Sequence, residues 1–260
     1  MELIKKDVLD FKMFLDTEDV GICKTIIDEG IHEKYSADYI KSILRPDMNV
    51  LDIGANIGYY VFIEASVVSH VYAVEPVIHN FNLLTKNIAL NKFQNITTYP
   101  LAIGGYNGIT DIYTSFGSNW AHIVPDNERL EENSLKENLY KKGVQKVPLY
   151  TLDNFIKSIG LEKIDLVRMD LEGAEVGVIA GGISTLNKMP KDSFLSIEVH
   201  SVFKDNKEKL GTMFDQIESS GFICERVTHG NVAEAEYSME ELRKSFISGD
   251  AWGQCHFKKH

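Results

Sequence analysis

The stretch that decides the fold is Val50-Leu51-Asp52-Ile53-Gly54-Ala55-Asn56-Ile57-Gly58. Its apolar first half predicts a buried strand, which runs directly into glycines and then into a predicted helix. Gly54 lets the chain turn sharply, and Gly58 lets a ligand or a helix approach the backbone. The start of a helix after such a turn presents free backbone N–H groups to an anionic group. The stretch therefore predicts a ligand-binding turn.

The glycine spacing differs from that of a dinucleotide-binding turn. That turn needs G-x-G-x-x-G, whereas Asn56 and Tyr59 occupy the second and third glycine positions. Asn tolerates the left-handed conformation, but its side chain stands where a pyrophosphate must press close. The spacing thus disfavours NAD and favours a ligand without phosphates. Asp52, at the end of the strand, suits the cationic amino group of a bound amino acid.

A second motif, Val74-Glu75-Pro76, ends the next apolar run. Glu75 follows Gly54 by 21 residues, and an acid about 20 residues after such a turn holds a ribose diol with two hydrogen bonds. Alone this glutamate would be unremarkable. Together with the turn it predicts a nucleoside-containing ligand.

The third motif places acids at the ends of two further apolar runs. Asp170 follows the run 165–169, and Glu172 stands two residues further on. Glu198 lies near the end of the run 193–199, and His200 follows it. If these strands are neighbours, the acids and the histidine reach the same cleft. They could deprotonate a hydroxyl, or Asp170 and Glu198 could bind a divalent cation such as Mg²⁺ or Mn²⁺. A lone histidine is as often structural as catalytic.

Short apolar runs alternate with amphipathic stretches along most of the chain. This alternation predicts an α/β fold with a doubly wound, mostly parallel, seven-stranded Rossmann-like sheet, whose ligands bind at the carboxyl ends of the strands. The predicted strands are residues 49–53, 70–74, 96–102, 165–169, 193–199, 222–227 and 252–258. The predicted helices are residues 36–45, 58–68, 78–91, 152–159, 174–186 and 207–219.

Two segments stand outside this alternation. Residues 1–45 are predicted to be a helical N-terminal segment, which leaves residues 46–260 as the Rossmann-like domain. An insertion around residues 115–147 interrupts that domain and is strongly polar over 126–146. A solvated surface helix is the simpler interpretation of that polar stretch, and a lid over the active site is the alternative.

The composition limits the possible partners and the compartment. The chain has 27 basic and 38 acidic side chains and a formal charge of −11, so we expect no nucleic-acid ligand. Three cysteines without a CxxC pair are typical of a reduced, cytoplasmic protein. We expect no membrane span, because the most apolar segment contains charged residues. The sequence leaves a homo-oligomer open.

The motifs in this order resemble the FkbM-type methyltransferases. The resemblance covers roughly residues 30 to 203 and is carried by a series of short stretches: DIGANIGYY, AVEP, KNIALN, PLAIG, TLDNF, DLVRMDLEGAE and IEVH. Enzymes of this type have a class I S-adenosylmethionine (SAM)-dependent fold and are similar to O-methyltransferases that act on hydroxyls of sugars or natural products.

The resemblance implies a role for individual residues. Asp52, Gly54, Ala55, Asn56 and Gly58 would line the methionine part of SAM, and Glu75 would take the ribose hydroxyls. Ala102 would offer its backbone to the adenine, and Pro76 would pack on the adenine face. Asp170 and Glu172 would lie beside the methyl group. Glu33 and Tyr35, before the first predicted helix of the domain, would reach over the cofactor.

These observations favour a SAM-dependent methyltransferase that modifies a hydroxyl on a small molecule or sugar. Asp170 or His200 could remove the hydroxyl proton, directly or through a metal ion. N-methylation of a sugar amine remains an alternative. Two other classes also remain, a nicotinamide-dependent oxidoreductase and a protein of the same fold that binds partners without catalysis.

The turn at residues 52–58 and Glu75 together generate the first prediction. SAM and S-adenosylhomocysteine (SAH) are expected to bind, and NADH is not, because Asn56 occupies the position where a pyrophosphate needs glycine. Isothermal titration calorimetry with each compound measures this. Binding of NADH without binding of SAM would show that the turn has been misinterpreted.

Overall fold

The computed structural model describes residues 2–123, 141–199, 207–229, 232–248 and 253–260. His200 and residues 124–140, the larger part of the polar stretch in the insertion, lie outside these ranges. Within the described ranges no helix is long and apolar enough to cross a membrane.

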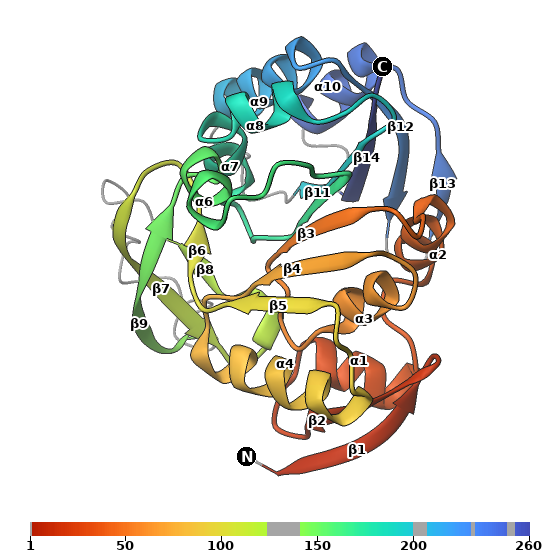
Figure 1. Cartoon of the computed structure of the whole chain (residues 1–260), viewed down its shortest axis with the longest axis vertical. Helices are drawn as coiled ribbons and strands as arrows, with labels where there is room; N and C mark the ends of the chain where they lie inside the picture. The colour runs from red at the N-terminus through yellow and green to blue at the C-terminus, as the bar shows by residue number, and fades with distance from the viewer. Residues whose placement is uncertain (1, 124–140, 200–206, 230–231, 249–252) are drawn as a thin grey trace.

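An eight-stranded sheet forms the centre of the molecule, in the order β13-β12-β14-β11-β10-β3-β4-β5 (Figure 1). Neighbouring strands from β5 to β11 are parallel, and β14 runs antiparallel to both β11 and β12. Seven of the strands correspond to those predicted from the sequence, and the short β13 adds an edge. The bounds are β3 (Asn49–Ile53), β4 (His70–Val74), β5 (Ile96–Tyr99), β10 (Leu166–Met169), β11 (Phe194–Val199), β12 (Phe222–His229), β13 (Val232–Ala235) and β14 (Gly253–Lys259).

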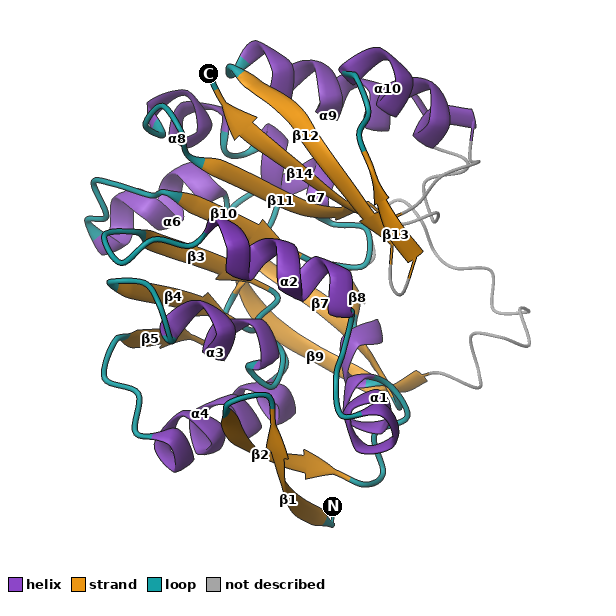
Figure 2. Ribbon diagram, turned by 90° about the vertical axis from the view of Figure 1, so that its right-hand side faces the viewer, coloured by secondary structure: helices purple, strands orange, loops and turns teal. Residues whose placement is uncertain are grey.

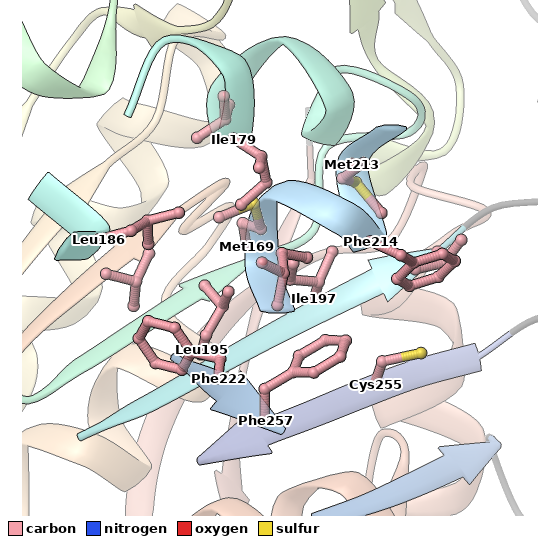
Figure 3. Packing of buried hydrophobic residues seen from close by; sticks show 14 of the residues in the cluster. Met169, Ile179, Leu186, Leu195, Ile197, Met213, Phe214, Phe222, Cys255 and Phe257 are labelled. Atoms are coloured by element: carbon pink, nitrogen blue, oxygen red, sulfur yellow. The ribbon is translucent and has the colours of Figure 1, made fainter. Parts of the chain in front are cut away.

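Helices cover both faces of this sheet, so the predicted doubly wound, mostly parallel fold is confirmed (Figure 2). One face carries α2 (Lys34–Ile43), α3 (Tyr59–Ala65) and α4 (Ile78–Asn91). The other carries α6 (Leu152–Ile159), α7 (Glu175–Ala180), α8 (Ile183–Lys188), α9 (Lys207–Ser219) and α10 (Met239–Ser248). On that second face, Leu195 and Ile197 of the sheet pack against Phe214 of α9 (Figure 3). Burial of these side chains is the main favourable contribution to folding.

The N-terminal segment is not wholly helical, which corrects the expectation for residues 1–45. It begins with the antiparallel hairpin of β1 (Leu3–Val8) and β2 (Phe11–Asp16), followed by α1 (Ile22–Glu29) and α2. Along β2 the side chains alternate between buried and more exposed positions, a period of two that indicates a strand. Asn87 of α4 fixes the hairpin, because its side chain bonds both the N–H and the carbonyl of Phe14, at 2.7 and 3.2 Å.

A second sheet, in the order β6-β9-β7-β8, contains the described ends of the predicted insertion and also takes in strands that precede residue 115. Its elements are β6 (Ala102–Ile103), β7 (Gly108–Ser115), the short 3-10 helix η1 (Ser118–Trp120), β8 (His122–Ile123) and β9 (Lys141–Tyr150). Residues 141–146 are therefore strand rather than surface helix. The predicted strand 96–102 is divided at Pro100, which has no N–H to donate to a ladder, so β5 stays in the main sheet and β6 joins the second.

Asp19 joins the N-terminal segment to the insertion. Its buried carboxylate accepts hydrogen bonds from the N–H groups of Gly21 (2.8 Å) and Cys23 (3.1 Å), and from both the N–H (2.8 Å) and the hydroxyl (2.7 Å) of Ser118. Burial alone would raise the pKa of Asp19, but the hydrogen bonds from Ser118, Cys23 and Gly21 together hold it below its ordinary value. The ionised form thus fixes the start of α1 against η1.

We expect Asp19→Asn to lower the free energy of unfolding by about 1.5–3 kcal/mol, the scale of hydrogen bonds to a charged group. Because the folded pKa is depressed, this contribution is present above the ordinary aspartate pKa and is lost as the pH falls through the folded pKa. Urea unfolding of both proteins from pH 7 down to pH 3 measures it. Asp111→Asn, on an exposed pair with Lys146, is the control. A stability difference that does not shrink in acid would contradict the assignment.

Candidate active site

A cavity lies at the carboxyl ends of β3, β4 and β10, where the sequence predicts the ligand site. The loop after β3 contributes Gly54, Ala55 and Asn56, and the end of β10 contributes Asp170. The predicted residues Glu75, Pro76 and Ala102 also line the cavity. All three motifs that stand at strand ends thus contribute to one cavity.

The N-terminal segment and the insertion cover this cavity from outside the sheet. Ile22 of α1 and the η1 residues Ser118 and Asn119 line it. Asn119 accepts a hydrogen bond from the N–H of Ile22 at 3.1 Å, and Asn80 of α4 donates to the carbonyl of Ser118 at 3.0 Å. Two segments that the sequence separates by about a hundred residues therefore close over the same site.

Glu75 is held in one orientation by backbone N–H groups. Its two carboxylate oxygens accept from Asn56 and from Val77, each at 2.8 Å. Burial raises the pKa of Glu75 to about 7, and the hydrogen bonds from Val77, Asn56 and the Asn80 side chain oppose that rise. A carboxylate has about four lone-pair sites, so beside these three hydrogen bonds Glu75 keeps an acceptor site for a ribose hydroxyl.

The two glycines of the turn are needed for packing within the protein. Both have a left-handed backbone, with φ of 87° at Gly54 and 100° at Gly58. A Cβ on Gly54 would lie 2.3 Å from the carbonyl oxygen of Asp170, and one on Gly58 would lie 2.8 Å from Leu84 of α4. Gly58 does not line the cavity. The sequence predicted that either a ligand or a helix approaches Gly58, and in the structure it is helix α4.

Asp52 lies away from the position expected for a ligand group. It is fully buried, does not line the cavity, and forms an ion pair with Arg168 of β10, with Nη1 and Oδ1 3.2 Å apart. Burial raises the pKa of Asp52, and the neighbouring guanidinium opposes that shift. The reason for the difference is the pleat, which points Asp52 into the layer of α3 rather than toward the strand end. Asp52 thus pairs with Arg168 and does not line the cavity in which a bound amino group would lie.

Arg168 connects this ion pair to the cavity. Its guanidinium lies 3.6 Å from the ring centre of Tyr60, and its Nη2 is 3.7 Å from Oδ2 of Asp170. Glu64 of α3 is also fully buried beside this group, and neither carboxyl oxygen has a hydrogen-bond partner among the described residues. Burial and the charge of Asp52 raise the pKa of Glu64 well above its ordinary value.

The acids of the third motif separate into different places. Asp170 lines the cavity, whereas Glu172 and Glu198 do not. Glu172 has a left-handed backbone, with φ of 50°, in the turn after β10. Glu198 lies opposite Gln254 in the register of β11 and the neighbouring β14. The described residues contain no group of three His, Cys, Asp or Glu side chains arranged to hold a metal ion.

Several lining residues were not predicted from the sequence. Tyr59 and Tyr60 follow the glycine turn directly, so a period of 3.6 residues from that turn could have indicated them. The others come from distant segments, and the strand and turn motifs carry no signal for them: Ile22, His32, Asn80, Leu101, Ile112, Ser118, Asn119 and Ala121. Glu33 and Tyr35 do not line the cavity, although Glu33 accepts a hydrogen bond from Tyr60 at 2.8 Å.

The lining of the cavity fits SAM. The fixed carboxylate of Glu75 suits a ribose hydroxyl, and the apolar side chains of Leu101 and Ile112 suit the adenine ring. The buried Oδ1 of Asn56 has no hydrogen-bond partner in the described structure, which leaves an acceptor for the amino group of a bound amino acid. A doubly wound sheet with this site defines the class of SAM-dependent methyltransferases.

Comparison with known proteins defines the family within that class. Residues 52–224 match the Methyltransferase FkbM domain, so the chain belongs to the FkbM methyltransferase family. It is 30% identical over 171 residues to the 2-O-methyltransferase NoeI of Sinorhizobium fredii, which covers 62% of this chain and 70% of NoeI. It is 28% identical over 178 residues to the antimetabolite synthetase AmbE of Pseudomonas aeruginosa, a match over 58% of this chain but only 8% of AmbE.

Solved structures share the fold. A methyltransferase candidate from Streptococcus mutans, in complex with SAH, superposes with a TM-score of 0.50 at 10% identity, over 87% of this chain and 97% of that one. An rRNA-methylase candidate from Clostridium thermocellum gives a TM-score of 0.51 at 13% identity, over 87% and 94% of the two chains. These structures confirm the predicted fold, and the match to the FkbM domain confirms the predicted SAM-dependent methyltransferase and its family.

The buried carboxylate of Glu75 generates a prediction on cofactor affinity. We expect Glu75→Gln to weaken SAM binding by about 1.5–3 kcal/mol. In the wild type, affinity should rise as the pH increases through about 7, because the carboxylate that accepts from the ribose forms over that range. Calorimetry between pH 6 and pH 8.5 measures both effects.

The exposed Glu162 provides the control for that experiment. Glu162→Gln should keep both the affinity and its pH dependence. A Glu75→Gln protein with wild-type affinity at pH 8.5 would mean that the ribose is held elsewhere.

Proposed function

We propose that this methyltransferase transfers the methyl group of SAM to a hydroxyl of a sugar or another small molecule. The observation that carries the proposal is the position of Asp170, a carboxylate in the cavity at the strand end across from Glu75. The similarity to a 2-O-methyltransferase supports a hydroxyl as the acceptor. The net charge of −11 disfavours nucleic acid as the acceptor.

Binding and orientation are the main tasks of the protein in this reaction. Bound SAM supplies a methyl carbon on a sulfonium, which is already an activated leaving group. Alignment of an acceptor with that carbon can contribute about 7–11 kcal/mol. The Asp170 carboxylate, which Arg168 holds in place, accepts the hydrogen bond of the acceptor hydroxyl and thereby directs the oxygen to the methyl group.

The other predicted catalytic and metal-binding residues have supporting or open roles. Glu172 stands in the turn next to Asp170 and shapes that turn. Glu198 and Asp170 remain the proposed ligands if Mg²⁺ or Mn²⁺ assists the reaction. His200 lies outside the described ranges, so its predicted role as a base stays a prediction. A screen of methylated products identifies whether the acceptor atom is a hydroxyl oxygen or the nitrogen of a sugar amine.

We expect Asp170→Asn to lower turnover by about a hundredfold or more, a part of the roughly 7–11 kcal/mol that alignment of the acceptor can contribute. SAM affinity should stay within about twofold, because Glu75 and the turn after β3 hold the cofactor. Methyl transfer from labelled SAM to a panel of methyl glycosides, with their amino-sugar counterparts, measures turnover. Calorimetry measures the affinity.

Two further results complete the test. If a metal ion assists, EDTA should reduce the wild-type rate to that of the variant, and added Mg²⁺ or Mn²⁺ should restore it. A rate that EDTA does not reduce would exclude a role for a metal ion and would leave the proposed role of Asp170 unchanged. Normal turnover of Asp170→Asn, or methylation of the amino sugars alone, would refute the proposed role and the proposed acceptor respectively.

A further inference from the structure

His32 is the one histidine that lines the cavity within the described part of the chain. It belongs to none of the three motifs and precedes α2. Its side chain is 15% exposed. Its backbone N–H donates to the hydroxyl of Tyr59 at 3.2 Å, and the two rings stand edge to face with centroids 5.8 Å apart. The backbone and the ring of His32 are therefore both fixed against α3.

Glu33 lies beside the imidazole and is itself fixed. Its Oε1 is 3.5 Å from Nε2 of His32, and its Oε2 accepts a hydrogen bond from the hydroxyl of Tyr60 at 2.8 Å. The backbone of Glu33 is left-handed, with φ of 46°, a conformation that is uncommon for residues other than glycine. Such a conformation persists where the surroundings enforce it, which here sets the carboxylate against the histidine.

The carboxylate decides which ring nitrogen of His32 carries the proton. The proton of a neutral imidazole lies on the nitrogen that faces an acceptor, so Glu33 favours the Nε2–H form. Nδ1 then carries the lone pair, and it is buried without a hydrogen-bond partner in the described structure. A lone pair accepts a proton but repels a carboxylate. This arrangement suits a base rather than a site for the carboxylate of SAM.

Tyr60 joins the segment that carries His32 to Asp170 through a series of contacts. The Tyr60 hydroxyl bonds Glu33, while the Tyr60 ring lies on Arg168, which contacts Asp170. The imidazole itself lies against Glu33 on its own segment and Tyr59 of α3. Tyr60, Arg168 and Asp170 are the titratable groups that follow in this series of contacts. A carboxylate and an imidazole thus both line the cavity in which the proposed hydroxyl would bind.

We propose that His32 is the general base for methyl transfer, with Glu33 as its positioning residue; this rests on the proposed function. A lone pair of the acceptor oxygen forms the new O–CH₃ bond, and the S–CH₃ bond breaks with its electron pair going to sulfur, which leaves neutral SAH. The hydroxyl proton moves to Nδ1 of His32. Glu33 stabilises the imidazolium until the proton passes to water. Asp170 then orients the hydroxyl and need not take its proton.

Three variants test this proposal on the full chain, with the methyl glycosides as acceptors. His32→Ala and His32→Asn should each lower turnover by about a hundredfold or more, with the Kd for SAM within about twofold. Added imidazole should partly restore turnover of His32→Ala, because it supplies the missing base in the vacated space. His70→Asn, on the distant His70 that bonds Thr97, should keep full activity.

A loss of SAM affinity that accounts for the loss of turnover would overturn the proposal, since His32 would then be a cofactor ligand. Failure of imidazole to restore any activity, with the variant folded and SAM bound, would also overturn it, because the histidine would then be structural.

The tautomer provides a test that does not depend on the acceptor. Nitrogen NMR of the imidazole at pH 8 should show His32 with the proton on Nε2, and Glu33→Gln should reduce that preference. A proton on Nδ1 in the wild type would refute the proposal even if glycosides are methylated. If His32 shows the expected tautomer but no glycoside is methylated, the proposed acceptor is wrong and the proposed role of His32 is not contradicted.

Discussion

The buried ion pair between Asp52 and Arg168 is the constraint on which the rest of the site depends. It joins β3 to β10 at paired register positions, one residue pair before the strands end. Removing two charges from water is unfavourable unless each finds its partner, and breaking such a pair costs about 3–5 kcal/mol. The pair therefore fixes the two strand ends, and with them the glycine turn on one strand and Asp170 on the other. Through Tyr60 it also reaches the segment that carries His32 and Glu33.

The fold and the strand-end residues could be predicted because their signals are local. Strand and helix periods are visible in short windows, and Glu75 and Asp170 were placed correctly at the ends of their strands. The placement of Asp52 was not predictable in the same way. Its partner is 116 residues away, and only the parallel register of β3 and β10 shows that the two side chains meet. Without that register, an acid in an apolar strand is interpreted equally well as a buried ion-pair partner or as a ligand-binding group.

The cover over the cavity could not be read from the sequence for a related reason. Asn119 bonds Ile22 and Asn80 bonds Ser118, so three separate segments meet through single polar contacts. The period of a helix or strand does not indicate such contacts. The hairpin of β1 and β2 was missed because its strands are short and because tertiary contacts with Asn87 stabilise it. Sequence reasoning therefore found the part of the site that the sheet builds and missed the part that the surrounding segments add.

The most direct test of this account is a crystal structure of the protein with SAH bound. The account predicts that a ribose hydroxyl lies within hydrogen-bond distance of the Glu75 carboxylate, while Asp52 remains paired with Arg168 and makes no contact with the ligand. It also predicts His32 and Asp170 at the end of the cavity where the sulfur lies. A structure in which Asp52 leaves Arg168 and binds the amino group of SAH, or in which the ribose lies away from Glu75, would contradict it.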